Sequence, residues 1–335
     1  MHLLDDIIAR TFEEIDFHKI KDHPNILIAA RFWDDDRYQA ARTIYRFMRH
    51  IDDMIDDRKA LNNMLSCMEK KIFTDRVNTW IDCLGLDNSH DPIFAEVTET
   101  IHRFRIPLHF FYNFARSMVY DIHHDGFRTF DEFLDYAEGA SNGPASVFVH
   151  LCCLESVRGE YIPPNLTISD VARPCAIFSY LVHIIRDFQK DQFNNLNYFA
   201  LDILEKNGLR PEDLKTMATG GEIVPGFRAV VNEYKEVAGK YMAETEKEIN
   251  LLQDKLEPRY LLSLKIIFRL YTEIYNRIDP QKGRFTSMEL NPAPEEVKES
   301  VLACIREFRK ERLQFTVYNP GSDGRFTVYN LGSGI

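Results

Sequence analysis

Apolar residues recur at helical spacing along almost the whole chain, and this repeat is the feature that most limits its fold. Between Asp36 and Asp57, steps of three and four join the apolar residues Ala41, Ile44, Met48, Ile51 and Ile55. Such steps place side chains on one face of an α-helix. The same repeat predicts helices over residues 128–156, 167–191, 225–256, from Pro258 onward, and over 292–312. No strand pattern of comparable length competes, so we expect an all-α protein.

The breaks between these segments are short. The chain of 335 residues has only 15 Gly and 14 Pro, which favours long helices. Breaks at Pro163-Pro164, Gly220-Gly221 and 279–283 have the composition of loops between helices. We therefore expect one helical domain over residues 1–312. Residues 313–335 form a tail in which Phe-Thr-Val-Tyr-Asn occurs twice, as a small hairpin or a disordered extension of unassigned role.

Charge and cysteine content exclude some classes of function. The net charge of -11 argues against a nucleic-acid-binding protein, which needs a basic surface. A phosphorylated substrate stays compatible, because a local cluster of cations can override the mean charge. The six cysteines contain no CxxC pair, the N-terminus has no signal-peptide pattern, and no run of about 18 apolar residues occurs. We expect a soluble protein of the cytoplasm.

The first candidate site is an acidic strip on the predicted helix 36–57. Tyr45, Arg49, Asp52 and Asp56 follow one another at steps of four, three and four, beside the apolar stripe. Carboxylates crowded at the edge of a core repel each other and lose hydration, so they are tolerated chiefly when a cation compensates. Ligands that are all oxygen suit Mg²⁺.

A second acidic strip ends the predicted helix 167–191. Tyr180, Asp187 and Asp191 share it, and His183 lies one turn before Asp187. A lone acidic cluster at a helix end is usually a solvated surface feature. Two facing clusters would instead hold metal ions and a diphosphate between them, as ionisation of an allylic diphosphate requires. The pattern alone leaves both interpretations open.

At these residues the chain resembles the squalene/phytoene synthase family, the head-to-head isoprenyl synthases, over roughly residues 20–290. Arg49 to Asp56 matches the family's first aspartate motif, and His183 to Asp191, followed by Tyr198-Phe199, matches the second. The segment from Tyr136 to Gly143 falls where the family bends a helix beside the substrate. The resemblance implies a class I terpenoid synthase fold, a single-domain helical bundle around a central cavity.

The resemblance also implies roles for individual residues. Mg²⁺, with Mn²⁺ as an alternative, would be bound by Asp52, Asp53, Asp56, Asp187 and Asp191. Catalysis at the diphosphate would involve Tyr45, Arg49, His183 and Arg186. The substrate would contact Asn25, Tyr136, Tyr180, Tyr198 and Tyr271. The His23-Pro-Asn25 run and the break at Ser141-Asn-Gly-Pro144 resemble the bacterial hopanoid branch, which makes hydroxysqualene.

Three positions depart from the family pattern. Tyr180 and His183 stand where the family usually has Gln and Asn, and Leu196 stands where it usually has Arg. Imidazole is a poorer Mg²⁺ ligand than a carboxamide oxygen. The departures predict an altered second metal site. They also predict a second half-reaction unlike that of a standard squalene synthase, through water capture or a single-substrate reaction.

Three hypotheses of function follow. The first is a Mg²⁺-dependent prenyltransferase that condenses two farnesyl or geranylgeranyl diphosphates. The second is a single-substrate cyclase or an enzyme that converts presqualene diphosphate. The third is a non-catalytic assembly or binding factor, which the intact set of repelling acids argues against. No dinucleotide fingerprint predicts an NADPH site, and we expect at most peripheral membrane contact for product release. The sequence does not indicate the oligomeric state.

Two further acidic groups receive plain structural interpretations. Asp34, Asp35 and Asp36 precede the first motif helix, where negative charge stabilises a helix N-terminus. Glu244 and Glu248, with Lys247 between them, step by three and four on one helix face. We expect that face to be solvated and salt-bridged.

Overall fold

The computed structural model describes residues 2–22, 25–61, 65–84 and 92–318. Its first half contains α1 (His2–Glu14), the 3₁₀ helix η1 (Phe17–Asp22), α2 (Asn25–Ala30), α3 (Asp35–Ala60), α4 (Cys67–Cys83), α5 (Pro92–Arg103), α6 (His109–His123), α7 (Phe130–Ala140) and α8 (Asn142–Cys153). Then follow β1 (Glu155–Val157), β2 (Glu160–Ile162), α9 (Ile168–Arg186), α10 (Phe188–Phe193), α11 (Leu201–Lys206), α12 (Pro211–Ala218), α13 (Pro225–Leu251), α14 (Pro258–Arg277), α15 (Ser287–Leu290) and α16 (Pro294–Tyr318). The predicted all-α class is confirmed.

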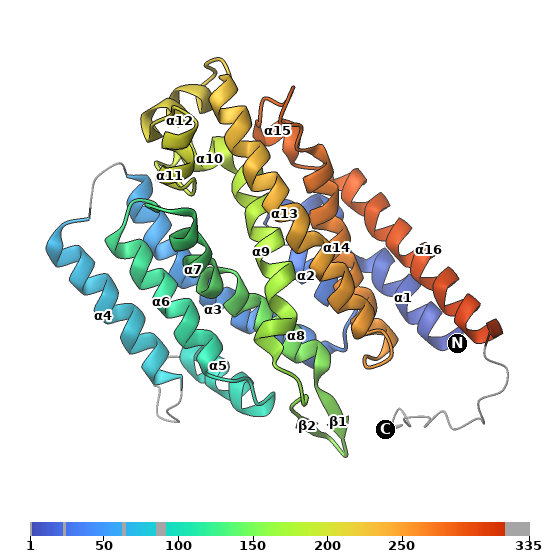
Figure 1. Cartoon of the computed structure of the whole chain (residues 1–335). Helices are drawn as coiled ribbons and strands as arrows, with labels where there is room; N and C mark the ends of the chain where they lie inside the picture. Colours follow the sequence, from blue (N-terminus) through green and yellow to red (C-terminus); the bar gives the residue numbers. More distant parts are fainter. Residues whose placement is uncertain (1, 23–24, 62–64, 85–91, 319–335) are drawn as a thin grey trace.

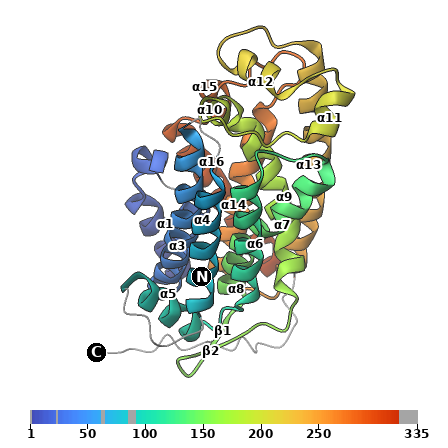
Figure 2. The same cartoon turned by 90° about the vertical axis from the view of Figure 1, so that its left-hand side faces the viewer.

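The helices surround α9, which runs through the middle of the molecule between α4 to α7 on one side and α13, α14 and α16 on the other (Figure 1). The short helices α10, α11, α12 and α15 gather at one end, and the hairpin of β1 and β2 protrudes at the other. Figure 2 shows α3, α4 and α6 side by side along the length of the bundle. Because α9 is surrounded, its apolar residues face neighbours almost all round.

Two segments predicted as single helices are each divided into two. Residues 128–156 form α7 and α8, which meet at Ser141, and the last two residues of the segment belong to β1 instead. The Ser141 hydroxyl donates a hydrogen bond of 2.8 Å to the carbonyl of Ala176 on α9, which fixes the break against the central helix. Residues 167–191 form α9 and α10, which meet at Asp187. Both divisions lie at positions that the sequence had marked as functional.

The N-terminus of α3 is fixed by a buried network. Asp34 caps the helix by accepting a hydrogen bond from the Arg37 backbone, so the predicted role of the acids before this helix is confirmed for Asp34. The Arg37 side chain is 3% exposed. It contacts Asp34, the Tyr260 hydroxyl and the Leu154 carbonyl just before β1. One arginine therefore links α3, α14 and the hairpin.

The last helix differs from the expected boundary of the domain. α16 continues to Tyr318, so residue 312 is not its end. The backbone of the first Phe-Thr-Val-Tyr-Asn copy, as far as Tyr318, is helical rather than a hairpin strand, and the second copy lies outside the described residues.

By length and composition alone, one helix among the described residues could cross a membrane. It is α9, and 56% of its apolar window is buried inside the bundle. A mostly buried core helix of a soluble protein can meet the same criterion. The predicted location in the cytoplasm stays a prediction.

Close approach of α6 and α7 generates a first prediction. A Cβ atom added at Gly139 of α7 would clash with the Asn113 carbonyl and the Ser117 hydroxyl of α6. Gly139→Ala should lower the free energy of unfolding by about 1–3 kcal/mol, because backbone on both sides resists movement. Gly239→Ala on α13 is the matched control. Its Cβ would meet only the Tyr275 hydroxyl at 2.9 Å, at the end of a movable side chain.

The control variant should be neutral or more stable by about 1 kcal/mol, since Ala is the better helix former. Denaturant titration of both variants measures the difference. Equal stability of the two variants would contradict the close packing of α6 on α7.

Candidate active site

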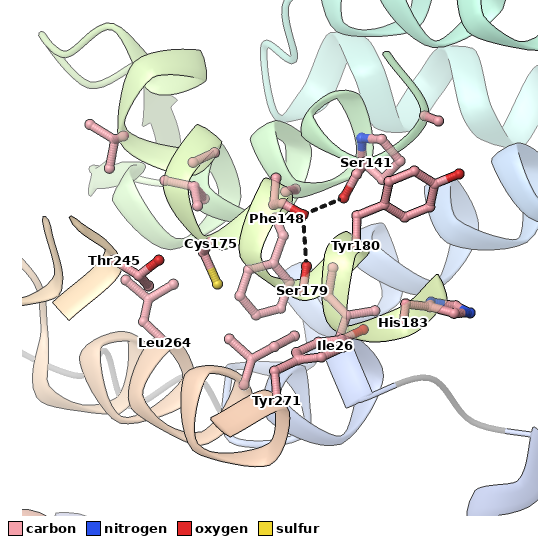
Figure 3. A pocket seen from close by; sticks show the side chains of 18 of the residues that line it. Ile26, Ser141, Phe148, Cys175, Ser179, Tyr180, His183, Thr245, Leu264 and Tyr271 are labelled. Atoms are coloured by element: carbon pink, nitrogen blue, oxygen red, sulfur yellow. Dashed lines mark hydrogen bonds between the residues drawn. The ribbon is translucent and has the colours of Figure 1, made fainter. Parts of the chain in front are cut away.

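A cavity of about 260 Å³ lies between α3, α8, α9, α13 and α14. Most of its wall is apolar, and Tyr45, Arg49, Asp52 and His183 supply polar groups at one end. In Figure 3, Tyr180 and His183 lie toward one side of the view, Thr245 and Leu264 lie at the other, and Tyr271 lies between them. Predicted site residues that line the cavity are Tyr45, Arg49, Asp52, Tyr136, Tyr180, His183 and Tyr271.

The α3 strip reaches the polar end of this cavity. Arg49 Nη1 lies 3.1 Å from Asp52 Oδ2, and its Nη2 lies 2.5 Å from Asp53 Oδ1. Asp52 faces the cavity, whereas Asp53 is on the outer side of the same helix turn. Burial raises the pKa of Tyr45, which lies one turn before Arg49. One guanidinium thus partly neutralises two of the three motif aspartates.

Asp56, the third motif aspartate, has no such partner among the described residues. Its Oδ1 is buried, and within the same ranges nothing donates a hydrogen bond to it. Burial and the carboxylates of Asp52 and Asp121 raise the pKa of Asp56. Burial also raises the pKa of Asp52, against the opposing effect of Arg49. Negative charge at this end of α3 is therefore undercompensated.

Asp191 on α10 is another carboxyl group whose pKa is raised. Burial and the Asp187 carboxylate raise its pKa to about 8, and Asp52 adds to the shift. Asp191 in turn raises the pKa of Asp56. The carboxylates of Asp52 and Asp56 on α3 and of Asp191 on α10 therefore lie near enough for their charges to interact.

Asp187 differs from these acids. It is 8% exposed. Arg186 Nε donates to its Oδ1 at 2.7 Å, Arg186 Nη2 donates to Oδ2 at 2.9 Å, and His183 Nε2 lies 2.7 Å from Oδ2. Burial alone would raise the pKa of Asp187, but these contacts outweigh it and hold the pKa well below its usual range. Burial and Arg186 lower the pKa of His183.

Three tyrosines form a wall next to the acids. Tyr136 is 4% exposed, and its ring centroid lies 6.2 Å from that of Tyr180. Tyr198 packs behind Tyr180 at 6.3 Å. It lines a second hollow of about 160 Å³ with Lys59 and Asp121 instead of the main cavity. Tyr198 therefore lies behind Tyr180, outside the main cavity in which the sequence predicted that it would contact the substrate.

The squalene/phytoene synthase sequence profile matches residues 21–296 of the chain, most of its length. The chain belongs to the squalene/phytoene synthase family.

Relatives within this family are distant. Phytoene synthase 2 of Solanum lycopersicum is 22% identical over 239 residues, which cover 71% of this chain and 73% of that protein. The phytoene synthase of Narcissus pseudonarcissus is 21% identical over the same length, but the match spans only 53% of it. The chain therefore spans about half the length of that curated relative.

Solved structures of similar shape include a dehydrosqualene synthase in complex with a ligand, at a TM-score of 0.67 and 15% identity over 92% of this chain and 99% of that one. Squalene synthase HpnC from Alicyclobacillus acidocaldarius has a TM-score of 0.58 and 14% identity, over 90% and 95% of the two chains. At these identities the structures show that the fold is shared.

The family typically uses Mg²⁺. Within the described ranges no three His, Cys, Asp or Glu side chains converge closely enough to hold a metal by themselves. Mg²⁺ often binds through one or two carboxylates together with substrate phosphates and water. The undercompensated Asp52, Asp56 and Asp191 fit that role, and the buried unpaired oxygen of Asp56 is the observation that supports it. Asp187 is less available to a metal than these three, because Arg186 and His183 already contact both of its oxygens.

Asn25, like Tyr198, is a predicted substrate contact that the structure places outside the main cavity. It starts α2 and lines a small separate hollow with Leu270 and Val297. Its neighbour Ile26 faces the main cavity instead. On so short a helix, a shift of one residue turns the side chain by about 100°, which the sequence pattern did not resolve.

Two features escaped the sequence interpretation. Lys59 Nζ and Asp121 Oδ1 form a buried ion pair of 2.6 Å that joins the end of α3 to α6, and its partners lie 62 positions apart. Glu248, expected on a solvated helix face, is half-buried and lines the cavity. Its spacing of three from Thr245 and four from Leu252 was the available signal.

Opposite environments of two motif aspartates generate the second prediction. In the metal-free protein, Asp56→Asn should raise the free energy of unfolding by about 1 kcal/mol, because it removes a carboxylate whose pKa the fold raises. At pH values above the pKa that the carboxyl group has in the unfolded chain, such a group lowers the free energy of unfolding. Asp187→Asn should lower the free energy of unfolding by about 2–4 kcal/mol, because it leaves the Arg186 charge without its counter-ion.

Denaturant titration with chelator at neutral pH measures both changes. The loss from Asp187→Asn should shrink in acid, since a depressed pKa stabilises the fold only at pH values above it. Shifts of the same sign for both variants would contradict the contrast between the two aspartates.

Proposed function

We propose that the protein is a Mg²⁺-dependent prenyltransferase that condenses two allylic isoprenoid diphosphates, farnesyl or geranylgeranyl, head to head. One observation carries this proposal. An apolar cavity ends at Arg49, Asp52 and His183, next to undercompensated carboxylates from two helices. An amphiphile with a hydrocarbon tail and a metal-bound anionic head has the matching polarity. Membership of the family implies isoprenoid diphosphates as substrates.

Each part of the site has a task in this reaction. Asp52, Asp56 and Asp191 would hold Mg²⁺, which when bound neutralises the charge on the departing diphosphate. Arg49 stands beside Asp52 and can contact the same diphosphate. The apolar wall keeps water from the allylic cation. The rings of Tyr136 and Tyr271 offer π-faces to positive charge in the cavity.

A second candidate function has its own support. Asp187 is held by Arg186 and His183, and His183 rather than Asp187 lines the cavity. Tyr180 adds a ring to the wall beside it. A site that lacks one metal ligand and has a narrower polar end favours a single diphosphate, so a single-substrate reaction or capture of the intermediate by water is the alternative.

The third prediction tests metal dependence. Incubation with Mg²⁺ and each allylic diphosphate should release diphosphate and yield a hydrocarbon or alcohol product, identified by mass spectrometry. Excess chelator should abolish turnover, and Mg²⁺ should restore it. Asp52→Asn should lower the rate by about 10²-fold or more, because the charge that stabilises the leaving group is lost.

Glu244→Gln, an exposed change on α13, is the control and should leave the rate unchanged. Full turnover in excess chelator would remove the proposal. Circular dichroism should show that both variants keep their helices.

The fourth prediction separates the two candidate functions. The double variant Tyr180→Gln, His183→Asn restores the residue types that the family usually has at these positions. It should shift the product distribution toward the condensed hydrocarbon, because Asp187 loses one competing contact and the wall loses a ring. Product analysis by chromatography gives the ratio. An unchanged product spectrum and rate would show that neither residue controls the outcome.

A further inference from the structure

α13 brings a single carboxylate to the apolar part of the cavity. Glu248 lines the wall beside Thr245, Ile249 and Leu252. Those three neighbours are at most 8% exposed, whereas Glu248 is half-buried. In the described part of the chain no hydrogen bond or ion pair engages the Glu248 side chain. Thr245 already donates its hydroxyl hydrogen to the Tyr241 carbonyl, so it offers Glu248 no donor.

Two contacts fix how far Glu248 lies from the acidic strips. The ring of Phe188, two residues beyond the end of α9, lies 4.5 Å from that of Phe227 at the start of α13. Near the other ends of the two helices, Arg173 Nη1 lies 3.4 Å from the Tyr241 hydroxyl, so α9 and α13 run antiparallel. At 1.5 Å per residue, Arg173 is about 15 Å from His183 along α9, and Glu248 is about 10 Å beyond Tyr241 along α13. Helical side chains lean toward the N-terminus, which brings the carboxylate to about 20 Å from His183.

Farnesyl and geranylgeranyl chains differ in whether they reach a point about 20 Å from His183. With about 1.3 Å per carbon–carbon bond along the chain, an extended farnesyl group spans about 14 Å and a geranylgeranyl group about 19 Å. A farnesyl chain that starts beside His183 ends among apolar residues. The last isoprene unit of a geranylgeranyl chain would reach Glu248.

We propose that Glu248 is a specificity-determining residue that selects 15-carbon over 20-carbon isoprenoid chains. A hydrocarbon that displaces water from this carboxylate leaves the charge uncompensated, which is unfavourable. The shorter chain avoids that contact. This inference rests on the proposed function, because it places the diphosphate at the acidic strips, and it names the substrate class for the same cavity.

The test is equilibrium binding by calorimetry with Mg²⁺ and the non-ionisable S-thiolodiphosphates of farnesol and geranylgeraniol. Glu248→Leu and Glu248→Gln are compared with the wild type, and Glu244→Gln, one helix turn away and exposed, is the matched control. In Glu248→Leu, the Kd of the 20-carbon analogue should fall at least tenfold while that of the 15-carbon analogue stays within twofold. Glu248→Gln should give a smaller change of the same sign, and the control none.

Each outcome decides between the two ideas. If the wild type binds the 15-carbon analogue but the ratio of the two Kd values is the same in Glu248→Leu, the inference about Glu248 is overturned and the proposed function stands. An equal shift in Glu244→Gln would also overturn it, because the effect would then be one of net charge. If the folded wild type binds neither analogue with Mg²⁺, both the proposed function and this inference fail.

Discussion

Repulsion between carboxylates at the end of a buried apolar cavity is the constraint on which the site depends. Asp52 and Asp56 on α3 and Asp191 on α10 all have raised pKa values, because burial removes water and each lies in the field of the others. A flexible chain would separate such charges. Here α3 is anchored at one end by the buried Arg37 and at the other by the Lys59–Asp121 pair, so the repulsion cannot relax by movement of the helix. Functional sites often lower the stability of a fold in this way, and a bound cation would offset the repulsion.

The two strips meet this constraint in different ways. On α3, Arg49 divides its charge between Asp52 and Asp53 and leaves Asp56 unpaired. At the junction of α9 and α10, Arg186 and His183 together satisfy Asp187. In the second strip, neighbouring side chains thus compensate the charge of Asp187, whereas the charge of Asp191 stays undercompensated. An incoming diphosphate meets most of the uncompensated negative charge on the α3 side and at Asp191, and it meets an imidazole where the second strip faces the cavity.

The sequence predicted the parts of this arrangement that depend on local periodicity. The stripe of α3 places Tyr45, Arg49 and Asp52 on one face whatever the rest of the chain does, and the structure keeps that face. Features set by tertiary contact were not predictable in this way. The break at Ser141 depends on a carbonyl of α9, the Lys59 partner lies on a distant helix, and Asn25 was one residue out of register on a short helix. The position of His183 one turn before Asp187 predicted a contact between the two side chains. That Arg186 also contacts both oxygens of Asp187 was visible only in the structure.

Glu248 shows why a local charge pattern can mislead. Spacings of three and four among charged residues describe a helix face, and a solvated face and a cavity wall share the same spacing. What distinguishes them is the surface that lies opposite: Glu248 lines the same cavity as Ile249 and Leu252 of α13 and Leu264 of α14. As a result the charged end of the site is built by α3, α9 and α10, whereas the wall farthest from the acids is built by α13 and α14. Residues that far apart contribute nearly independently to binding, so the length of the bound chain could change in this fold without disturbing the groups that hold the diphosphate.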